Sequence, residues 1–482
     1  MKLISLFIFS YIFHTVWSLS LKTSNLRLGR LKCHSQQDGT QSTDKSANPM
    51  FCGVNSQPKK RRLRPVSEQT RKPVNPREWV DRDGTSSLSS PDYFPREGLK
   101  VVTYNVLGPL HGEGSKHDYA AEAITRWTRR RDRLIEEIID LDADILCLQE
   151  VSQKALKETF IPRLLTSGLE CSGFAPSKRG DQKTGKYAHK YVGCAIFTRK
   201  SKLTLVQSKR VHLRDWAPMN ECKSLTLREE MKSHWNCMAM ALLKVRKEHD
   251  GEEEDLESAQ ASQKASEKTV MVGNAHLFWN PARADVKVLQ AAACTHALDK
   301  FAAEIGASPP VLLCGDFNTP PALQEDFNPD NYQEYSIPAR EGAESYSGVT
   351  GRMSGAFQFL CGGSIENDHP QHPDNWCLKL GDKGVPNPQM GSLKSPLPTL
   401  HHPYLSIPEF RPYQPLFTTR TDDFSAWIDH IWCTQNVHVA AVMSPVIRAG
   451  DLEAGLKRRE FRPIPSKEHP SDHLPLGVMI TL

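Results

Sequence analysis

The stretch VLLCGDFNTPP, residues 311–321, passes from four apolar residues to Gly, Asp and Asn and ends in two prolines. An apolar run of this length is typical of a strand that is covered on both faces. Pro320 and Pro321 prevent further ladder pairing. We therefore expect Asp316 and Asn318 to lie where a buried strand ends. The alternative is an ordinary turn, since Gly, Asp and Asn are all common turn residues.

Other strand-like runs of the chain also stop at polar residues. The runs 101–104, 145–149 and 270–275 are followed by Asn105, Glu150 and His276, and two later strands carry Asp429 and the pair Asp472 and His473. One such residue alone is more often a cap or a solvated side chain. Six such sites on the strands of one domain indicate instead a polar site that is assembled from strand ends.

The chain alternates strand-like and helix-like stretches from about residue 97. Residues 124–141 and 283–305 carry apolar side chains at helical spacing. Strand-like runs occupy residues 99–107, 143–151, 191–199, 203–211, 236–245, 269–278, 426–434 and 473–482. The pattern predicts a hairpin for 191–199 and 203–211, and a solvated loop for the acidic segment 246–268. Many strands with few helices predict an α/β fold, in which two mixed β-sheets pack face to face between helices as a four-layered sandwich.

The N-terminal part of the chain differs from the rest. Residues 1–20 have the basic start, the apolar run and the small residues of a signal peptide. The run is shorter than the roughly 20 residues of a spanning helix, so we expect no stable membrane insertion. Residues 21–77 contain 13 Lys and Arg against three Asp and Glu, whereas residues 78–482 carry a net charge of about −6. We expect residues 21–96 to be a disordered segment and residues 97–482 to form one domain.

A signal-like peptide followed by a basic, acid-poor stretch resembles the two-part targeting sequence of plastid proteins in algae with secondary plastids. We therefore expect entry into the secretory pathway and transfer to a plastid or another organelle. Secretion, mitochondrial import and nuclear import through the basic run at residues 59–64 are the alternatives. None of the twelve cysteines forms a CxxC pair, which disfavours a structural zinc site. Cys147, Cys194, Cys314 and Cys433 lie in apolar runs, as in a reduced protein interior.

The polar residue types at the strand ends suit metal-assisted hydrolysis of a phosphodiester. Glu150, with Asn105 and Asp472 nearby, offers the oxygen ligands that Mg²⁺ or Mn²⁺ prefers. Such an ion binds few protein groups and leaves positions for water and phosphate oxygens. The chain contains no GxSxG motif that would indicate a nucleophilic serine.

The remaining strand-end residues suit proton transfer and phosphate contact. Asp316 could orient or deprotonate an attacking water, while Asn318 and His276 could donate to phosphoryl oxygens. An imidazole backed by a carboxylate, as His473 would be by Asp429, is an oriented proton acceptor or phosphate partner. These eight residues together predict a catalytic site.

Seven motifs occur in a fixed order along the chain: TYNVL, ILCLQEV, GCAIF, NAHLFWNPARADVKVLQ, LLCGDFNTPP, IDHIW and HPSDHLPL. In this order they resemble the endonuclease/exonuclease/phosphatase superfamily. Within it they resemble the carbon-catabolite-repression type of deadenylase, with its nocturnin and Angel relatives. GDFN and SDH alone indicate only the superfamily, whereas the HLFWNP…DVK..Q stretch points to the deadenylase branch. The resemblance covers essentially all of residues 97–482.

The resemblance implies a role for each matched position. It implies metal coordination by Glu150 with Asn105 beside it, contact of His276 with the scissile phosphate, action of Asp316 and Asn318 at the attacking water and the phosphoryl oxygens, and orientation of His473 by Asp429. The chain departs from the family at Asn280, where an acidic residue is usual. It also contains no leucine-rich repeats, through which the multi-subunit deadenylases dock the rest of their complex.

The expected function is that of a Mg²⁺-dependent 3′-exoribonuclease on single-stranded RNA, with poly(A) tails as the substrate. One alternative keeps the chemistry but changes the substrate to the 2′-phosphate of NADP(H), as in nocturnin, or to 2′-5′ oligoadenylate. The acidic charge of residues 78–482 mildly favours a small substrate, because long RNA usually recruits a basic track. A non-catalytic scaffold that binds RNA or protein is disfavoured, because every expected site position holds a chemically competent residue.

Overall fold

The computed structural model describes residues 77–82, 98–113, 117–178, 191–219, 222, 224–246, 268–322, 353–375, 390–422, 424–446, 448 and 462–482. The expected signal peptide, the basic segment up to residue 76 and most of the acidic segment 246–268 lie outside these residues. The targeting predictions therefore stay predictions. No described helix combines the length and the apolar character that crossing a membrane requires.

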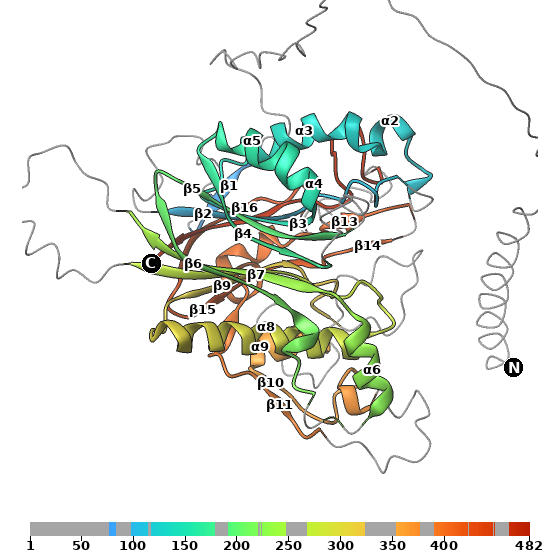
Figure 1. The fold of residues 1–482 in the computed structure, drawn as a ribbon, viewed down its shortest axis with the longest axis vertical. Coiled ribbons are helices and arrows are strands. Elements are labelled where there is room, and N and C mark those ends of the chain that lie inside the picture. Colours follow the sequence, from blue (N-terminus) through green and yellow to red (C-terminus); the bar gives the residue numbers. More distant parts are fainter. Residues whose placement is uncertain are drawn as a thin grey trace, which may run out of the picture. The chain divides into compact units, whose positions relative to one another are not determined.

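Two large mixed β-sheets form the centre of the described structure (Figure 1). The first sheet has the spatial order β1 (Trp79–Asp81), β16 (His438–Met443), β17 (Leu476–Thr481), β2 (Leu99–Asn105), β3 (Ile145–Ser152), β5 (Val192–Arg199) and β4 (Leu169–Pro176). The second has the order β12 (Leu400–His401), β15 (Asp429–Thr434), β9 (Val311–Asp316), β8 (Thr269–His276), β7 (Cys237–Val245) and β6 (Leu203–His212). Two short ribbons pair β10 (Ser364–Ile365) with β11 (Leu393–Lys394) and β13 (Thr419–Arg420) with β14 (Ser425–Ala426).

Helices cover the outer face of each sheet (Figure 1). The seven-stranded sheet is covered by α2 (Glu122–Thr125), α3 (Trp127–Asp140), α4 (Gln153–Ala155) and α5 (Ile161–Leu165), with the π-helical turn η3 (Leu156–Phe160) between the last two. The six-stranded sheet is covered by α8 (Ala284–Ile305), α9 (Gly355–Gly362) and α6 (Leu225–Ser233). The short elements η4 (Leu213–Asp215), α11 (Pro403–Ser406) and η6 (Pro408–Tyr413) complete the described helices. The predicted four-layered sandwich is confirmed.

The prediction of a hairpin for residues 191–199 and 203–211 is wrong. β5 pairs with β3 and β4 in one sheet, whereas β6 pairs with β7 in the other. The chain thus crosses between the sheets at the short connection that follows Arg199. Both segments have the local pattern of a strand, and that pattern is the same whether consecutive strands pair or stack.

The predicted boundary at residue 97 also differs from the structure. β1 lies within the segment that we expected to be disordered, yet Trp79 and Val80 are buried and β1 pairs antiparallel with β16. Two large apolar side chains suffice for an edge strand that has a partner. The polar composition of segment 21–96 as a whole masks these two apolar residues, so composition alone does not predict β1.

A buried polar bridge joins the two sheets. Gln149 on β3 donates from Nε2 to Asn274 Oδ1 on β8 at 2.7 Å. Asn274 in turn donates from Nδ2 to the carbonyls of Leu148 and Ala195 at 3.0 and 2.8 Å. A buried polar group that loses its hydrogen-bond partner destabilises the fold, so this bridge favours one alignment of the sheets. It lies one residue before Glu150 and two before His276, so it also aligns the strand ends that carry the predicted site.

Candidate active site

Three predicted site residues form one row across the six-stranded sheet. Asp316 ends β9 and pairs with Asp429, the first residue of β15. On its other side Asp316 pairs with His276, the last residue of β8. Paired residues on adjacent strands project to the same face, so the three side chains lie next to one another. The strand-end interpretation of GDFN is confirmed over the turn interpretation.

The backbone around this row adopts unusual conformations. Gly315 has φ +147°, and a Cβ atom at this position would lie 1.9 Å from the carbonyl oxygen of Ala275, so only glycine lets β9 approach β8 here. Glu150 and Asn318 have φ values of +60° and +49°, which non-glycine residues rarely adopt. Backbone strain of this kind concentrates at functional sites. The strained positions therefore support the same site that the residue types indicated.

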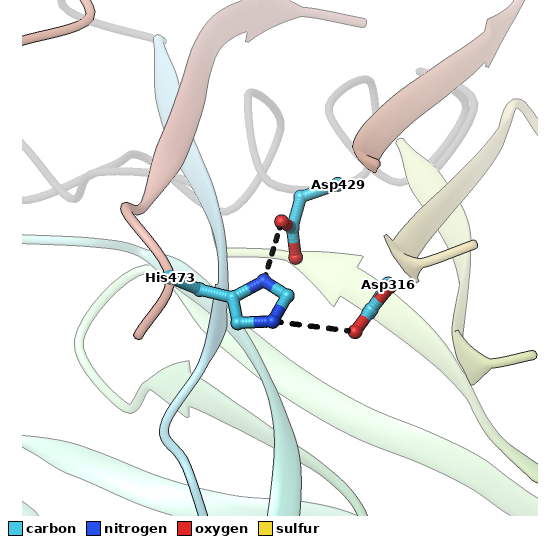
Figure 2. A group of neighbouring side chains, drawn as sticks. All are labelled: Asp316, Asp429 and His473. Carbon is cyan, nitrogen blue, oxygen red and sulfur yellow. Dashed lines mark hydrogen bonds and ion pairs between the residues drawn. The ribbon is translucent and has the colours of Figure 1, made fainter. Parts of the chain in front are cut away.

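His473 lies between two carboxylates (Figure 2). Its Nδ1 is 2.7 Å from Asp429 Oδ2, and its Nε2 is 3.8 Å from Asp316 Oδ2. Burial opposes a charge on this imidazole, but the carboxylates of Asp429 and Asp316 raise the pKa of His473 well above its usual value. His473 precedes β17, a strand of the other sheet, so the predicted Asp429–His473 pair forms between the sheets and not on neighbouring strands of one sheet. A positively charged His473 is poised to donate a hydrogen bond.

Asn105 connects the two halves of the site. From the end of β2, its Nδ2 donates to Asp316 Oδ2 at 2.9 Å and to Glu150 Oε1 at 3.3 Å. Its Oδ1 accepts from the backbone N–H of Leu107 at 3.1 Å. With the oxygen directed to the backbone, Asn105 acts in this structure as a bridge between two carboxylates.

Glu150 lies within β3, where the pairing with β5 shifts register, and it is held there by the loop that follows β2. Its Oε2 accepts from the Gly108 N–H at 2.7 Å and lies 2.6 Å from His111 Nδ1. Burial alone would raise the pKa of Glu150, but His111, His276 and the Gly108 amide lower it well below its ordinary value. Glu150 is thus ionised at neutral pH.

Asp472, the third predicted metal ligand, contacts a histidine of the segment after β2. Its Oδ2 is 3.1 Å from His117 Nε2, and its Oδ1 is buried without a hydrogen-bond partner among the described residues. The neighbouring Ser471 donates to the carbonyl oxygen of Asn105 at 2.7 Å. Metal binding by Asp472 stays a prediction.

Two groups of side chains could hold a cation. The ionised Glu150 fits Mg²⁺ or Mn²⁺, and the unpartnered Oδ1 of Asp472 is a further oxygen donor. Asp316, Asp429 and His473 also present ligand atoms that lie within 4.8 Å of one another. In this group, however, His473 Nδ1 already contacts Asp429 Oδ2 at 2.7 Å, so these two side chains satisfy each other. We therefore favour Glu150 as the centre of the metal site.

Helix α8 explains why the HLFWNP…DVK..Q stretch has its pattern. Lys287 donates from Nζ to the carbonyl oxygen of Asn318. Gln290 accepts from the N–H of Phe278 at 2.7 Å and donates to Asn236 Oδ1 at 3.0 Å. Asn236 donates to the carbonyl oxygen of His276 at 3.0 Å. The helix thus fixes the main chain at His276 and Asn318, the two residues predicted to contact phosphate. Residue types alone did not reveal this support.

Asn280, the departure from the family pattern, caps a local turn. Its Oδ1 accepts from the backbone N–H of Ala282 at 2.9 Å. An Asn in this position hydrogen-bonds its own backbone two residues on, as such residues commonly do in turns. The side chain therefore has a structural partner of its own.

Arg130 is a second support that the sequence analysis missed. This buried residue of α3 donates to the carbonyl oxygens of Thr125, Val106, Leu107, Gly108 and Pro470. Burial lowers the pKa of Arg130 to about 10, against the opposing carboxylates of Asp472 and Glu150. A signal was present, because Arg130 falls between Trp127 and Leu134 on the apolar face of the helix.

A family model supports the fold and the motif order. The model of the endonuclease/exonuclease/phosphatase family matches residues 102–473, and this span contains all eight predicted site residues. The chain belongs to the endonuclease/exonuclease/phosphatase family. The roles of individual residues stay predictions.

Curated relatives fall in the Ccr4 branch of this family, as the motifs indicated. The chain is 25% identical over 425 residues to the CCR4-Not complex 3′-5′-exoribonuclease subunit Ccr4 of Neosartorya fischeri. This alignment covers 85% of the chain and 50% of that protein. It is 26% identical to CCR4-NOT transcription complex subunit 6-like-B of Xenopus laevis, over 85% of the chain and 68% of that protein. The chain thus spans about half the length of the first of these relatives.

A solved structure of the same fold is that of ANGEL2, described as a 2′,3′-cyclic phosphatase in complex with adenosine-2′,3′-vanadate. It aligns with a TM-score of 0.53 and 20% identity, over 84% of this chain and 98% of that one. The similarity covers both sheets of the described structure, and at this level of identity it concerns the fold.

Proposed function

We propose that the protein is a metal-dependent phosphodiesterase that acts as a 3′-exoribonuclease and shortens poly(A) tails. The observation that carries the proposal is the joining of two carboxylates, Glu150 and Asp316, by Asn105, with the Asp429–His473 pair at the same point. A metal-holding carboxylate next to a proton-handling group is what hydrolysis of a phosphodiester requires. The choice of RNA is supported by the 3′-5′-exoribonuclease named among the curated relatives.

The residues of the site divide the chemistry among them. A bound Mg²⁺ or Mn²⁺ at Glu150 would polarise a phosphoryl oxygen and stabilise negative charge there. Asp316 accepts a proton from the attacking water and holds this water in line with the phosphorus–oxygen bond that breaks. His276 and the amide of Asn318 donate to phosphoryl oxygens, and the positively charged His473, oriented by Asp429, donates to the oxygen on which charge develops.

The net charge of residues 78–482 supports a second candidate. Residues 78–482 carry about −6, which suits a small phosphorylated substrate better than a long polyanion. The same site chemistry would then remove the 2′-phosphate from NADP(H) or cleave 2′-5′ oligoadenylate.

A panel of substrates separates these candidates. The purified protein is incubated with Mg²⁺ and with oligo(A), RNA of mixed sequence, 2′-5′ oligoadenylate or NADP(H), and parallel samples contain a chelator. We expect stepwise shortening of oligo(A) from its 3′ end only when Mg²⁺ is present. Release of phosphate from NADP(H) while RNA stays intact would replace the first candidate by the second.

The destination of the protein is a separate proposal, which rests on residues 1–77 alone. A signal-like start followed by a basic segment is the reason to expect import into a plastid or a similar organelle. Fusing residues 1–96 to a fluorescent protein in an algal cell tests it. Secretion of the fusion, or its accumulation in the nucleus, contradicts the proposal.

A further inference from the structure

A cationic pocket lies beyond the active site at the edge of the six-stranded sheet. Its described lining consists of Arg214, Met219, Arg228, Met231 and Lys232, around a cavity of about 460 Å³. Three of these five side chains are basic and none is acidic. η4, which directly follows β6, supplies Arg214, and α6 supplies Arg228, Met231 and Lys232.

The strand register places this pocket in line with the active site. His212, the last residue of β6, pairs with Cys237, Cys237 pairs with His276, and His276 pairs with Asp316. Adjacent strands are about 4.8 Å apart, so His212 lies roughly 14 Å from Asp316 along this edge. Arg214 follows His212 by two residues. The pocket and the active site thus lie along the same edge of one sheet.

Trp235 connects the pocket to the active site. The Arg214 Cζ atom lies 3.4 Å from the centre of the Trp235 ring, and Lys178 Nζ lies 5.0 Å from it. The next residue, Asn236, donates to the carbonyl oxygen of His276 at 3.0 Å. Lys178 follows β4, which belongs to the other sheet, so both sheets contribute a cation at this edge.

The acidic groups that contact Arg214 and Lys232 offset little of the positive charge of these two side chains. Arg214 Nε is 3.6 Å from Asp215, and Lys232 Nζ is 2.7 Å from Glu229, but these carboxylates are 59% and 72% exposed. Exposed ion pairs are weak and are screened by salt. The guanidinium of Arg214 is also held in place, since its Nη1 donates to the carbonyl oxygen of Lys232 at 2.7 Å. A fixed cationic site indicates an anionic ligand.

We propose that this cationic pocket binds the phosphodiester backbone of a single-stranded oligonucleotide whose 3′ end occupies the active site. The inference rests on the proposed function and deepens it, because it selects a polynucleotide over NADP(H). Guanidinium groups bind phosphate in two-point contacts, and a cation stacked on an indole ring loses little freedom on binding. The separation of roughly 14 Å between His212 and Asp316 corresponds to about four nucleotides at the roughly 3.4 Å rise of one helical strand, and Arg214 lies two residues beyond His212. A substrate in such a conformation therefore needs at least about five nucleotides to reach from the active site to the pocket.

Binding in the absence of metal tests the pocket independently of catalysis. The dissociation constants of fluorescein-labelled 12-nucleotide and 2-nucleotide oligo(A) are measured in EDTA for the wild type, Arg214→Gln and the double variant Arg228→Gln/Lys232→Gln. We expect both variants to weaken binding of the 12-mer about tenfold and to leave the dinucleotide unchanged. The log–log slope of 12-mer affinity against salt concentration should become shallower by about 0.7 for each phosphate that a variant no longer binds. Arg129→Gln, an exposed change on α3, is the matched control and should change neither.

The outcomes separate the pocket from the proposed activity. Unchanged 12-mer affinity in both variants, or equal losses of affinity for the 12-mer and the dinucleotide, contradicts the proposal that the cationic pocket binds the phosphodiester backbone. A wild type that binds the 12-mer through these residues but cleaves no RNA contradicts the exoribonuclease and leaves the pocket standing. When cleavage is observed, the variants should raise KM for the 12-mer and leave kcat unchanged, because the pocket lies away from the reacting phosphate.

Discussion

Glu150 carries the strongest single-residue expectation of the site. Its carboxylate is ionised, is bound by Asn105 and Gly108, and is the group best suited to a divalent cation. Glu150→Gln removes the charge and keeps the shape of the side chain, and it also replaces one of its two acceptor oxygens by a donor. The positive φ of Glu150 is equally strained for glutamine, so the backbone has no reason to change.

We expect Glu150→Gln to lower kcat by at least about 10³-fold, while the melting temperature stays within a few degrees. The rate is measured at several Mg²⁺ concentrations and the folding by circular dichroism. Residual hydrolysis close to the wild-type rate, or hydrolysis without a divalent ion, would remove Glu150 from the metal site.

The 2.7 Å contact between His473 and Asp429 predicts that the two residues act as a unit. Residues that serve one function are not additive when both are removed. Asp429→Asn and His473→Ala should each lower kcat/KM by about 10³-fold, and the double variant should lose little more. Losses that multiply fully in the double variant would show two independent roles.

His430 is the matched control for this pair. It follows Asp429 on β15 but projects to the other face, where its Nε2 donates to the carbonyl oxygen of Thr319 at 2.8 Å and its Nδ1 meets His402 Nε2 at 3.2 Å. Glutamine can also donate to Thr319. His430→Gln should therefore change kcat/KM less than about tenfold.

At the scale of elements, α3 supports the active site through Arg130. One guanidinium satisfies carbonyl oxygens in the loop after β2 and in the segment before β17. A lysine has a single point charge with three donors and cannot reach all five oxygens, so buried acceptors would lose their partners.

We expect Arg130→Lys to lower the free energy of unfolding by about 2–4 kcal/mol and to lower kcat more than it raises KM, because the loops that hold Glu150 and His473 loosen. Denaturant unfolding and steady-state kinetics measure the two effects. Arg129→Gln, at the adjacent exposed position, should leave both unchanged. An Arg130→Lys protein with wild-type stability would show that the carbonyl contacts are dispensable.

The elements and their ends could be predicted from the sequence, but their assembly could not. The apolar run before Asp316 located a strand end, and the spacing of residues 283–305 located α8. The run before Glu150 located a register shift inside β3, which continues to Ser152. Which sheet each strand joins depends on contacts over long separations, such as the Asn105–Asp316 hydrogen bond across 211 residues. For the same reason the hairpin at 191–211 was mispredicted, and Lys287 and Arg130 were not recognised as supports.

At the scale of the whole molecule, the buried His402 and His430 and the half-buried His469 couple folding to pH. Burial lowers the pKa of His430 and of His469 to about 4, and it lowers the pKa of His402 well below its usual value. The unfolded chain takes up protons near pH 6.5, whereas the folded chain does not. Their contribution to stability is therefore complete above about pH 6.5 and is lost as the pH falls toward 4.

We expect the free energy of unfolding to fall as the pH is lowered from 7 to 5, with a slope of up to about 1.4 kcal/mol per pH unit from each such histidine. His430→Gln should make the slope shallower, because one of these groups is removed. Denaturant titrations at pH 5, 6 and 7 compare the two proteins. An identical pH dependence would show that His430 takes up its proton in the folded state as it does in the unfolded state.

The contact between the end of β2 and the segment before β17 has a consequence for the synthesis of the protein on the ribosome. Ser471 donates to the carbonyl oxygen of Asn105 at 2.7 Å, although 366 residues separate them along the chain. The first strand that supplies the site is therefore translated long before its last partner. A nascent chain that contains Asn105 and Glu150 but lacks His473 has no assembled active site. If the protein cleaves RNA, its own messenger and the ribosome that translates it are safe from it until synthesis has passed His473.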